Sequence, residues 1–192
     1  MKKATKIIAL LLCAVLLVGA SVAGTLAYLT SKGSVTNTFT VGEVEITLKE
    51  KALDVETGKQ QTGGTPVTGL QDIKLIPGRT IEKEPFITVG EDSEDCWLFV
   101  KVENGLEGAG EITWAADWAQ IGTTDYWKYS KTVSAEDVVT VFTEFVCDED
   151  LGHDELEDFE GAEIVITAYA IQSEGVSADD AWDSLKGQLN LT

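Results

Sequence analysis

Histidine chemistry is limited in this chain, because His153 is its only histidine. A zinc protease of the H-E-x-x-H type needs two imidazoles one helical turn apart, and His153 has no second histidine to pair with. A serine triad of the hydrolase type needs a G-x-S-x-G turn, which the sequence lacks. We therefore expect a solvated loop histidine and no catalytic residue, so the protein is predicted not to be an enzyme.

The most acidic stretch of the chain surrounds this histidine. Its carboxylates are Asp148, Glu149, Asp150, Asp154, Glu155, Glu157, Asp158 and Glu160. Calcium takes roughly six to eight oxygen ligands, but the EF-hand order, with its central glycine and closing glutamate, is not met here. We therefore expect a solvated acidic loop and no cofactor. A calcium site is the alternative, with Asp148, Glu149, Asp150 and Asp154 as its candidate ligands.

Three tryptophans suggest a second kind of chemistry, the stacking of indoles on sugar rings. Trp114, Trp118 and Trp127 lie in the aromatic-rich stretch 112–131. The cores of β-proteins also bury tryptophan, so we expect core or subunit contacts, with glycan binding as the alternative. Paired carboxylates for glycoside cleavage cannot be identified, because among 33 acidic residues some pair will be close by chance.

The first 27 residues have the layout of a secretory signal peptide. Three lysines (Lys2, Lys3 and Lys6) precede the apolar run 7–18, and small residues follow it. The apolar run has about 12 residues, whereas a membrane-spanning helix needs about 20. We place cleavage between Ala27 and Tyr28, and an uncleaved membrane anchor is the alternative.

Charge limits the partners of the mature chain. Residues 28–192 keep 11 of the 14 basic residues and all 33 acidic ones, which gives a formal charge of −22. Such a surface repels nucleic acid and anionic membranes. We therefore expect no nucleic-acid partner, and membrane contact only through an uncleaved signal segment.

Two cysteines, Cys96 and Cys147, follow the signal segment. In an exported protein such a pair can form one disulfide, although the sequence does not show that the two residues meet. The alternative is two buried free thiols, because both cysteines border strongly apolar segments.

Short segments rich in β-branched and aromatic residues predict strands. They span residues 36–48, 81–89, 96–103, 138–147 and 164–171. Pro85 favours an edge strand or a bulge in the second segment, because proline cannot donate to a sheet ladder. The polar, glycine-rich stretch 57–69 is expected to be a mobile loop or a long hairpin tip.

Only the end of the chain predicts a helix outside the signal segment. Ser177 stands in the N-cap position with Asp180 three residues later, and Ala181, Trp182, Leu185 and Leu189 form one apolar stripe. Short strands without β-α-β alternation indicate an all-β domain over residues 28–192. We expect an antiparallel two-sheet sandwich of jelly-roll type, preceded by the signal-peptide helix and ending in a helical segment at 173–192.

The residues around the expected cleavage site resemble the start of TasA/camelysin-type proteins. The resemblance is carried by Gly24-Thr25-Leu26-Ala27 before the cut, Tyr28-Leu29-Thr30 after it, and Asn37-Thr38-Phe39-Thr40-Val41-Gly42 further on. Further similarity lies in Ile76-Pro77-Gly78, in the strand 96–104, and in Ala168-Tyr169-Ala170-Ile171-Gln172 followed by Ala181-Trp182.

This resemblance implies a secreted jelly-roll subunit of the cell surface or biofilm matrix of a Gram-positive-type bacterium. A dedicated signal peptidase, SipW, would release it, and its partners would be further copies of itself and other matrix components. The implied mechanism is donation of a new N-terminal strand, residues 28–35, to a neighbouring subunit, which yields fibres. Tyr28, Leu29 and Val35 are the expected apolar anchors of that strand.

Two other functions stay open at this point. The first is a monomeric cell-surface binding module for a glycan or matrix ligand. The second is a camelysin-like metallopeptidase, which the single histidine disfavours.

Overall fold

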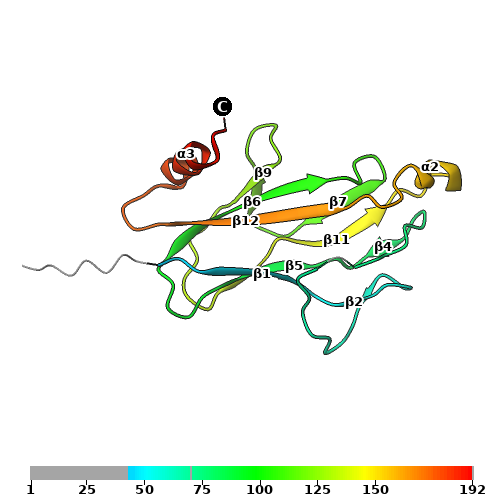
Figure 1. Cartoon of the computed structure of the whole chain (residues 1–192), viewed down its shortest axis with the longest axis horizontal. Coiled ribbons are helices and arrows are strands. Elements are labelled where there is room, and N and C mark those ends of the chain that lie inside the picture. The colour runs from blue at the N-terminus through cyan, green and yellow to red at the C-terminus, as the bar shows by residue number, and fades with distance from the viewer. Residues whose placement is uncertain (1–42, 70, 192) are drawn as a thin grey trace, which may run out of the picture. The chain divides into compact units, whose positions relative to one another are not determined.

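A computed structural model describes residues 43–69 and 71–191, and these residues are mostly in antiparallel strands with a helix near the C-terminus (Figure 1). The expected signal peptide, its cleavage point at Ala27 and Tyr28, and the anchors Leu29 and Val35 lie outside the described residues. The coarse expectation of an all-β antiparallel chain with a short C-terminal helix is confirmed.

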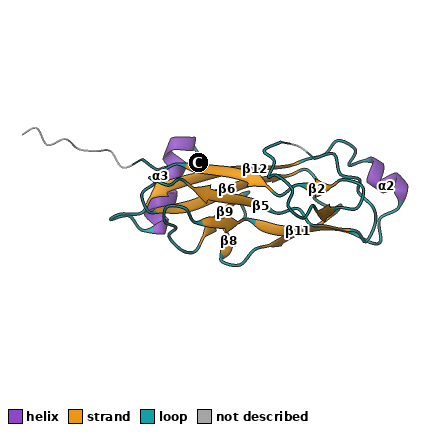
Figure 2. Cartoon of the chain, turned by 90° about the horizontal axis from the view of Figure 1, so that it is seen from below, coloured by secondary structure: helices purple, strands orange, loops and turns teal. Residues whose placement is uncertain are grey.

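The first half of this unit contains β1 (Ile46–Glu50), β2 (Leu53–Asp54), β3 (Lys59–Gln60), β4 (Thr80–Ile81), β5 (Pro85–Val89) and β6 (Cys96–Asn104). The second half contains β7 (Gly110–Trp114), β8 (Trp118–Gln120), β9 (Tyr126–Tyr129), β10 (Val138–Thr140), β11 (Phe142–Cys147), α2 (His153–Glu157), β12 (Ile164–Gln172) and α3 (Ala178–Leu189). Helices α2 and α3 lie at opposite ends of this body (Figures 1 and 2).

The strands lie in two layers. One layer is the sheet β12-β6-β9-β8. The other layer contains two sheets, β1-β5-β10 and β4-β11-β7. These two sheets are continuous, because β5 directly follows β4 along the chain and β11 directly follows β10. The N–H of Val141 donates to the carbonyl of Pro85 at 2.9 Å, where the two sheets meet. The hairpin β2–β3 is attached beside this second layer.

One hydrophobic core joins the two layers. It contains Ile87, Val89, Cys96, Leu98, Val100, Val102, Trp118, Val133, Val139, Val141 and Phe142, all of them buried. Alternate residues of each strand supply these side chains, because neighbouring residues on a strand point to opposite faces. The strands predicted at 96–103 and 164–171 from their β-branched and aromatic residues correspond to β6 and β12, which pair along the whole length of β12.

Two expected strands are interrupted. The segment 81–89 breaks at residues 82–84, and Pro85 is the first residue of β5. Because β5 pairs with β1 on one side and β10 on the other, the expectation of an edge strand at Pro85 was wrong. A strand's first position tolerates proline, which explains its place here. The segment 138–147 breaks at Val141, and its register on β7 shifts between Phe142 and Glu144.

Helix α3 covers the outer face of the sheet β12-β6-β9-β8. The Ser177 hydroxyl accepts a hydrogen bond from the N–H of Asp180 at 3.2 Å, as the sequence predicted. Ala181 and Leu185 are buried against Phe99, which points away from the main core. The helix thus buries a face of β6 that would otherwise be apolar and exposed.

Candidate functional site: an open seam between the two layers

The two layers each end in a strand that has no strand partner on its outer side. Within residues 43–69 and 71–191, β12 pairs only with β6, and β1 pairs only with β5. Cα atoms of β1 and β12 approach within 8 Å of each other, so the two free edges lie along the same side of the molecule. We call this region the open seam.

Hydrogen-bond register shows which backbone groups face the seam from β12. Ser173 N–H donates to the Asp95 carbonyl, and Gly105 N–H donates to the Glu163 carbonyl. Odd-numbered residues of β12 therefore bond to β6, since pairing alternates along an antiparallel ladder. The N–H and C=O groups of the even-numbered residues point outward into the seam; these residues are Ile164, Ile166, Ala168 and Ala170.

The same alternation applies to β1. Gly90 N–H donates to the Glu45 carbonyl at 2.8 Å, so odd-numbered residues of β1 bond to β5. Ile46 and Leu48 therefore present their backbone groups to the seam. At Glu50 the outward groups are already occupied, because Glu50 and Val67 exchange two hydrogen bonds of 2.8 Å. Within residues 43–69 and 71–191, the seam is thus bordered by two edges without a strand partner and is bridged at Glu50.

The opposite side of the two layers is closed by aromatic residues. Trp114 of β7 stacks on Trp127 of β9, with ring centroids 3.5 Å apart. Trp118 is buried, and its indole N–H donates to the Thr140 carbonyl at 2.9 Å. All three tryptophans thus pack on or within the core, as one of the two sequence interpretations expected. Within the described residues, β8 and β7 also lack a strand partner on this side, but β8 has three residues and β7 five, whereas β12 has nine.

A groove runs along the seam and widens toward α2. Its narrow part has a volume of about 270 Å³ and lies between Leu48–Glu50 of β1 and Glu163–Ile166 at the start of β12. Its wide part, which we call the wide pocket, has a volume of about 950 Å³. The two parts share Lys83, Glu163 and Ile164, so they form one continuous groove.

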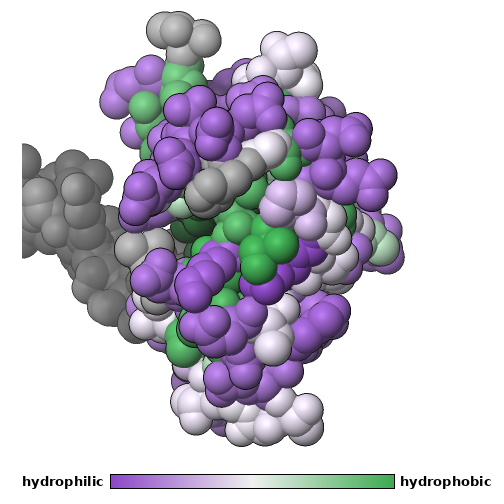
Figure 3. Space-filling view, turned by 90° about the vertical axis from the view of Figure 1, so that its right-hand side faces the viewer, coloured by the Kyte–Doolittle hydropathy of each residue, from purple (hydrophilic) through white to green (hydrophobic). Residues whose placement is uncertain are grey.

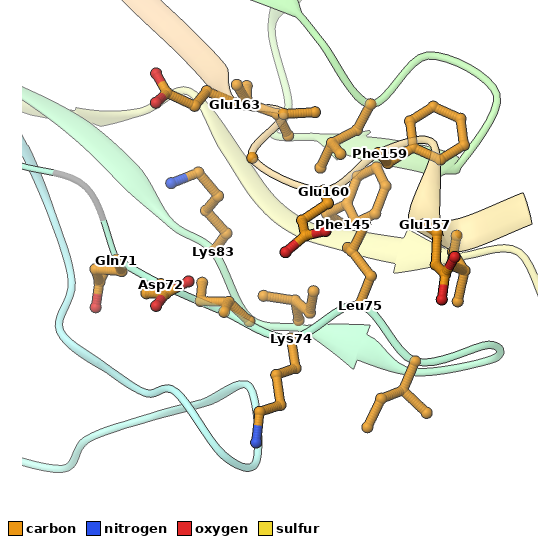
Figure 4. A pocket seen from close by; sticks show the side chains of 18 of the residues that line it. Gln71, Asp72, Lys74, Leu75, Lys83, Phe145, Glu157, Phe159, Glu160 and Glu163 are labelled. Carbon is orange, nitrogen blue, oxygen red and sulfur yellow. The ribbon is translucent and has the colours of Figure 1, made fainter. Parts of the chain in front are cut away.

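The wide pocket has an apolar interior. Phe145, Ile81 and Leu106 form its floor and are buried. Leu75 from the chain before β4 and Phe159 from the loop after α2 lie against this floor from two sides (Figure 4). Seen from the α2 end, the molecule shows apolar residues at the bottom of a hollow that hydrophilic residues surround (Figure 3).

One wall of the wide pocket is an extended segment that belongs to no sheet. Residues 71–76 alternate between half-buried and exposed positions, as a strand does. Yet the N–H groups of Ile73, Lys74 and Leu75 have no hydrogen-bond partner in the part of the chain that the structure describes. Such a segment has the backbone pattern that pairs readily with another extended chain.

The rim of the wide pocket is mostly acidic. Its carboxylates belong to Asp72, Glu157, Glu160 and Glu163, and Figure 4 shows them around the apolar centre. Two lysines near this rim form ion pairs. Lys74 Nζ lies 3.4 Å from Glu56 Oε2, and Lys83 Nζ lies 2.5 Å from Glu50 Oε1. The second pair is largely shielded from water, since the two side chains are 16% and 13% exposed.

A polar network fixes the strands that border the groove. Glu82 accepts hydrogen bonds from the N–H of Gln60 and from Lys59, and these lower the pKa of Glu82. Burial raises the pKa of Glu84, but hydrogen bonds from Lys51 and Gln60 outweigh it, so the net shift is downward. Both carboxylates therefore hold the hairpin β2–β3 in place as anions. This hairpin stands where the sequence predicted the beginning of a loop at 57–69.

Cys96 and Cys147 do not form a disulfide. Both are free and buried, and they belong to different core clusters. Burial raises the pKa of the Cys96 thiol to about 11, and the nearby carboxylates of Asp95 and Asp137 add to the effect. Burial also raises the pKa of Cys147. Of the two sequence alternatives, the structure has the buried free thiols.

The acidic stretch is not entirely a loop. Residues 153–157 form the short helix α2, in which the Glu155 carboxylate accepts from the N–H of Gly152 at 2.8 Å. Asp148, Glu149, Asp150 and Asp154 are exposed. Within the described residues, no group of three or more His, Cys, Asp or Glu side chains is arranged to hold a metal ion.

The sequence analysis did not identify the open seam or the wide pocket. The sequence does contain one signal for the seam. The segment that forms β12 is long, apolar and free of charged residues and proline, which is unusual for an edge strand. What makes it an edge is the order of strands in the sheets, and a single sequence does not give that order.

Comparison with known proteins adds no relative, since no family model, no curated protein and no solved structure matches the chain. Among the described residues, no helix is long and apolar enough to cross a membrane.

Proposed function

We propose that this protein is a secreted structural subunit of the cell surface or biofilm matrix, and that it polymerises into fibres by donating its N-terminal strand. In this proposal the two layers form a jelly-roll sandwich, and the open seam of one copy receives residues 28–35 of another. The alternative of a metallopeptidase is disfavoured by the single histidine, His153.

The observation that carries the proposal is the edge of β12 that has no strand partner within the described residues. A strand added to the edge of β12 would bond to the outward groups of Ile164, Ile166, Ala168 and Ala170. Cα atoms of β1 and β12 approach within 8 Å, less than the roughly 9.5 Å between two strands that flank a third, so β12 is the acceptor edge and β1 borders the groove. Main-chain hydrogen bonds of this kind are a general basis for strand addition. The added strand would cover the long free edge of β12.

The position of the chain entrance favours linear assembly. The Glu43 carbonyl accepts from the N–H of Glu94, so the chain enters beside the start of β6. The wide pocket includes Leu106, just beyond the end of β6. The nine residues of β6 span roughly 30 Å at about 3.3 Å each. A donor segment that leaves one end and an acceptor groove that opens at the other give a head-to-tail contact, which extends instead of closing.

Signal cleavage would act as the switch. While residues 1–27 remain attached, residues 28–35 are tethered at the membrane and cannot enter a neighbouring groove. After cleavage, Tyr28 becomes the N-terminus of a free strand. Tyr28, Leu29 and Val35 are the proposed anchors, because they are its large apolar residues.

Electron microscopy of purified residues 28–192 tests the proposal. We expect fibres from this chain and monomers from two comparison proteins, one that lacks residues 28–34 and one with ten extra residues before Tyr28. Fibres that form equally well without residues 28–34 would refute strand donation. Monomers from all three proteins at high concentration would favour the alternative of a surface binding module.

A further inference from the structure

We infer that the wide pocket is the seat for residues 36–42 of the incoming chain, with the Phe39 ring of a second copy on its apolar floor. This inference rests on the proposed strand donation and adds to it a specific anchor. It assigns an occupant to a cavity that residues 28–35 do not account for.

The shape of the groove sets the order in which an incoming strand fills it. The groove is wide beside α2 and narrow between β1 and β12. A strand that enters at the wide end with its N-terminus leading places residues 28–35 deep along β12, in antiparallel orientation. Residues 36–42 enter last, so they remain in the wide pocket, close to the folded part of the donor subunit.

The composition of residues 36–42 suits the pocket. Phe39 and Val41 share one face of an extended chain, because side chains alternate with a period of two. A buried phenyl ring is a strong anchor, and the floor of Phe145, Ile81 and Leu106 offers it an apolar contact surface. The extended wall at residues 71–77 offers unpaired N–H groups to the same incoming backbone.

Charge is also compatible with this occupant. All 33 acidic residues lie at position 43 or later, so residues 28–42 contain none, and Lys32 is their single charged side chain. A segment that carries acidic residues would be repelled by the carboxylates on the rim. An acid-free segment avoids that repulsion.

Photo-crosslinking tests the assignment directly. Phe39 is replaced by p-benzoylphenylalanine, an aromatic analogue that preserves the proposed contact, in residues 28–192. Labelled and unlabelled chains are mixed before assembly, so that crosslinks between copies can be distinguished from those within one copy by mass spectrometry. We expect crosslinks between copies to peptides 71–77 and 156–164. The matched control carries the same group at Thr38, on the opposite face, and should give at least tenfold fewer of these crosslinks.

The outcomes separate this inference from the function on which it rests. Fibres whose Phe39 crosslinks fall within one copy, or on another surface, would overturn the inference and leave strand donation standing. Failure of the unmodified chain to assemble would overturn both. Phe39→Ala should raise the critical concentration for assembly at least tenfold while leaving the thermal midpoint of the monomer unchanged, and an unchanged critical concentration would also overturn the inference.

Discussion

At the scale of single residues, Gly110 shows how closely β7 and β11 approach each other. A Cβ atom added at this position would lie 2.1 Å from the Val146 carbonyl oxygen and 2.9 Å from Cys147 Cα. These are backbone atoms, so they cannot move aside as the end of a flexible side chain would. We therefore expect Gly110→Ala to lower the free energy of unfolding by roughly 1–3 kcal/mol or more.

Chemical denaturation of the two matched variants Gly110→Ala and Gly187→Ala measures this effect. Gly187 lies in α3, and a Cβ there meets no atom within 4 Å. Because alanine is more favourable than glycine inside a helix by up to about 1 kcal/mol, Gly187→Ala should be neutral or stabilising. Equal stabilities for the two variants would contradict the close approach at Gly110.

The two cysteines give a second prediction at this scale. Both thiols are buried, and burial holds their pKa above the ordinary value, to about 11 for Cys96. Since the thiolate is the reactive form, neither cysteine should react with iodoacetamide in the folded protein at pH 8. Both should react after denaturation without a reductant. If the cysteines reacted only after the protein had been both denatured and reduced, a disulfide would be indicated instead.

At the scale of elements, the hairpin β2–β3 should be sensitive to acid. Glu82 and Glu84 have a lowered pKa in the folded protein, so their contribution to stability is present above the ordinary value of 4.5. It is lost progressively as pH falls below that value. We expect amide exchange in the hairpin to accelerate between pH 6 and pH 3.5 relative to exchange in β6, after correction for intrinsic rates.

A double variant tests which carboxylates are responsible. Glu82→Gln with Glu84→Gln should flatten the pH dependence of exchange in the hairpin. Glu56→Gln is the matched control. The Glu56 side chain is exposed, and its Oε2 atom lies 3.4 Å from Lys74 Nζ, away from the network around Gln60. If the control flattened the profile as much as the double variant does, the network around Gln60 would not be the cause.

The edge strand β12 gives the second prediction at this scale. The N–H of Ala168 faces the seam, and its side chain is small. Ala168→Pro therefore removes one seam-facing donor while leaving the hydrogen bonds to β6, which use the odd-numbered residues, intact. We expect this variant to remain a folded monomer by circular dichroism and to assemble at least tenfold more slowly in light-scattering measurements. Assembly at the rate of the parent chain would argue against β12 as the acceptor edge.

Much of the fold was predictable from local patterns, whereas the candidate site was not. β6 and β12 follow from their β-branched and aromatic residues, and helix α3 follows from its Ser177 cap and apolar stripe, because each signal lies within a few neighbouring residues. The interior position of β5 and the free edge of β12 depend on strand order, which long-range packing decides. The wide pocket brings together residues 71–77, 81, 83, 106, 145, 156–157 and 159–164, so no local pattern could indicate it.

At the scale of the whole molecule, the arrangement of the open seam relative to the chain entrance gives the subunit a direction. One side of the two layers carries the stacked Trp114 and Trp127, and the other carries the nine-residue strand β12, whose outer edge has no strand partner within the described residues. An exposed apolar edge is a hazard for aggregation unless it has an intended partner. Strand donation supplies that partner and uses the same edge to build a fibre.

The most direct test of this account is residue-resolved hydrogen exchange on β12, compared between monomer and fibre. In the monomer, N–H groups of the odd-numbered residues should be protected by β6, and those of Ile166, Ala168 and Ala170 should exchange rapidly. The account predicts that assembly protects these three amides at least a hundredfold while the odd-numbered residues change little. Fibres in which Ile166, Ala168 and Ala170 exchange as fast as in the monomer would contradict it.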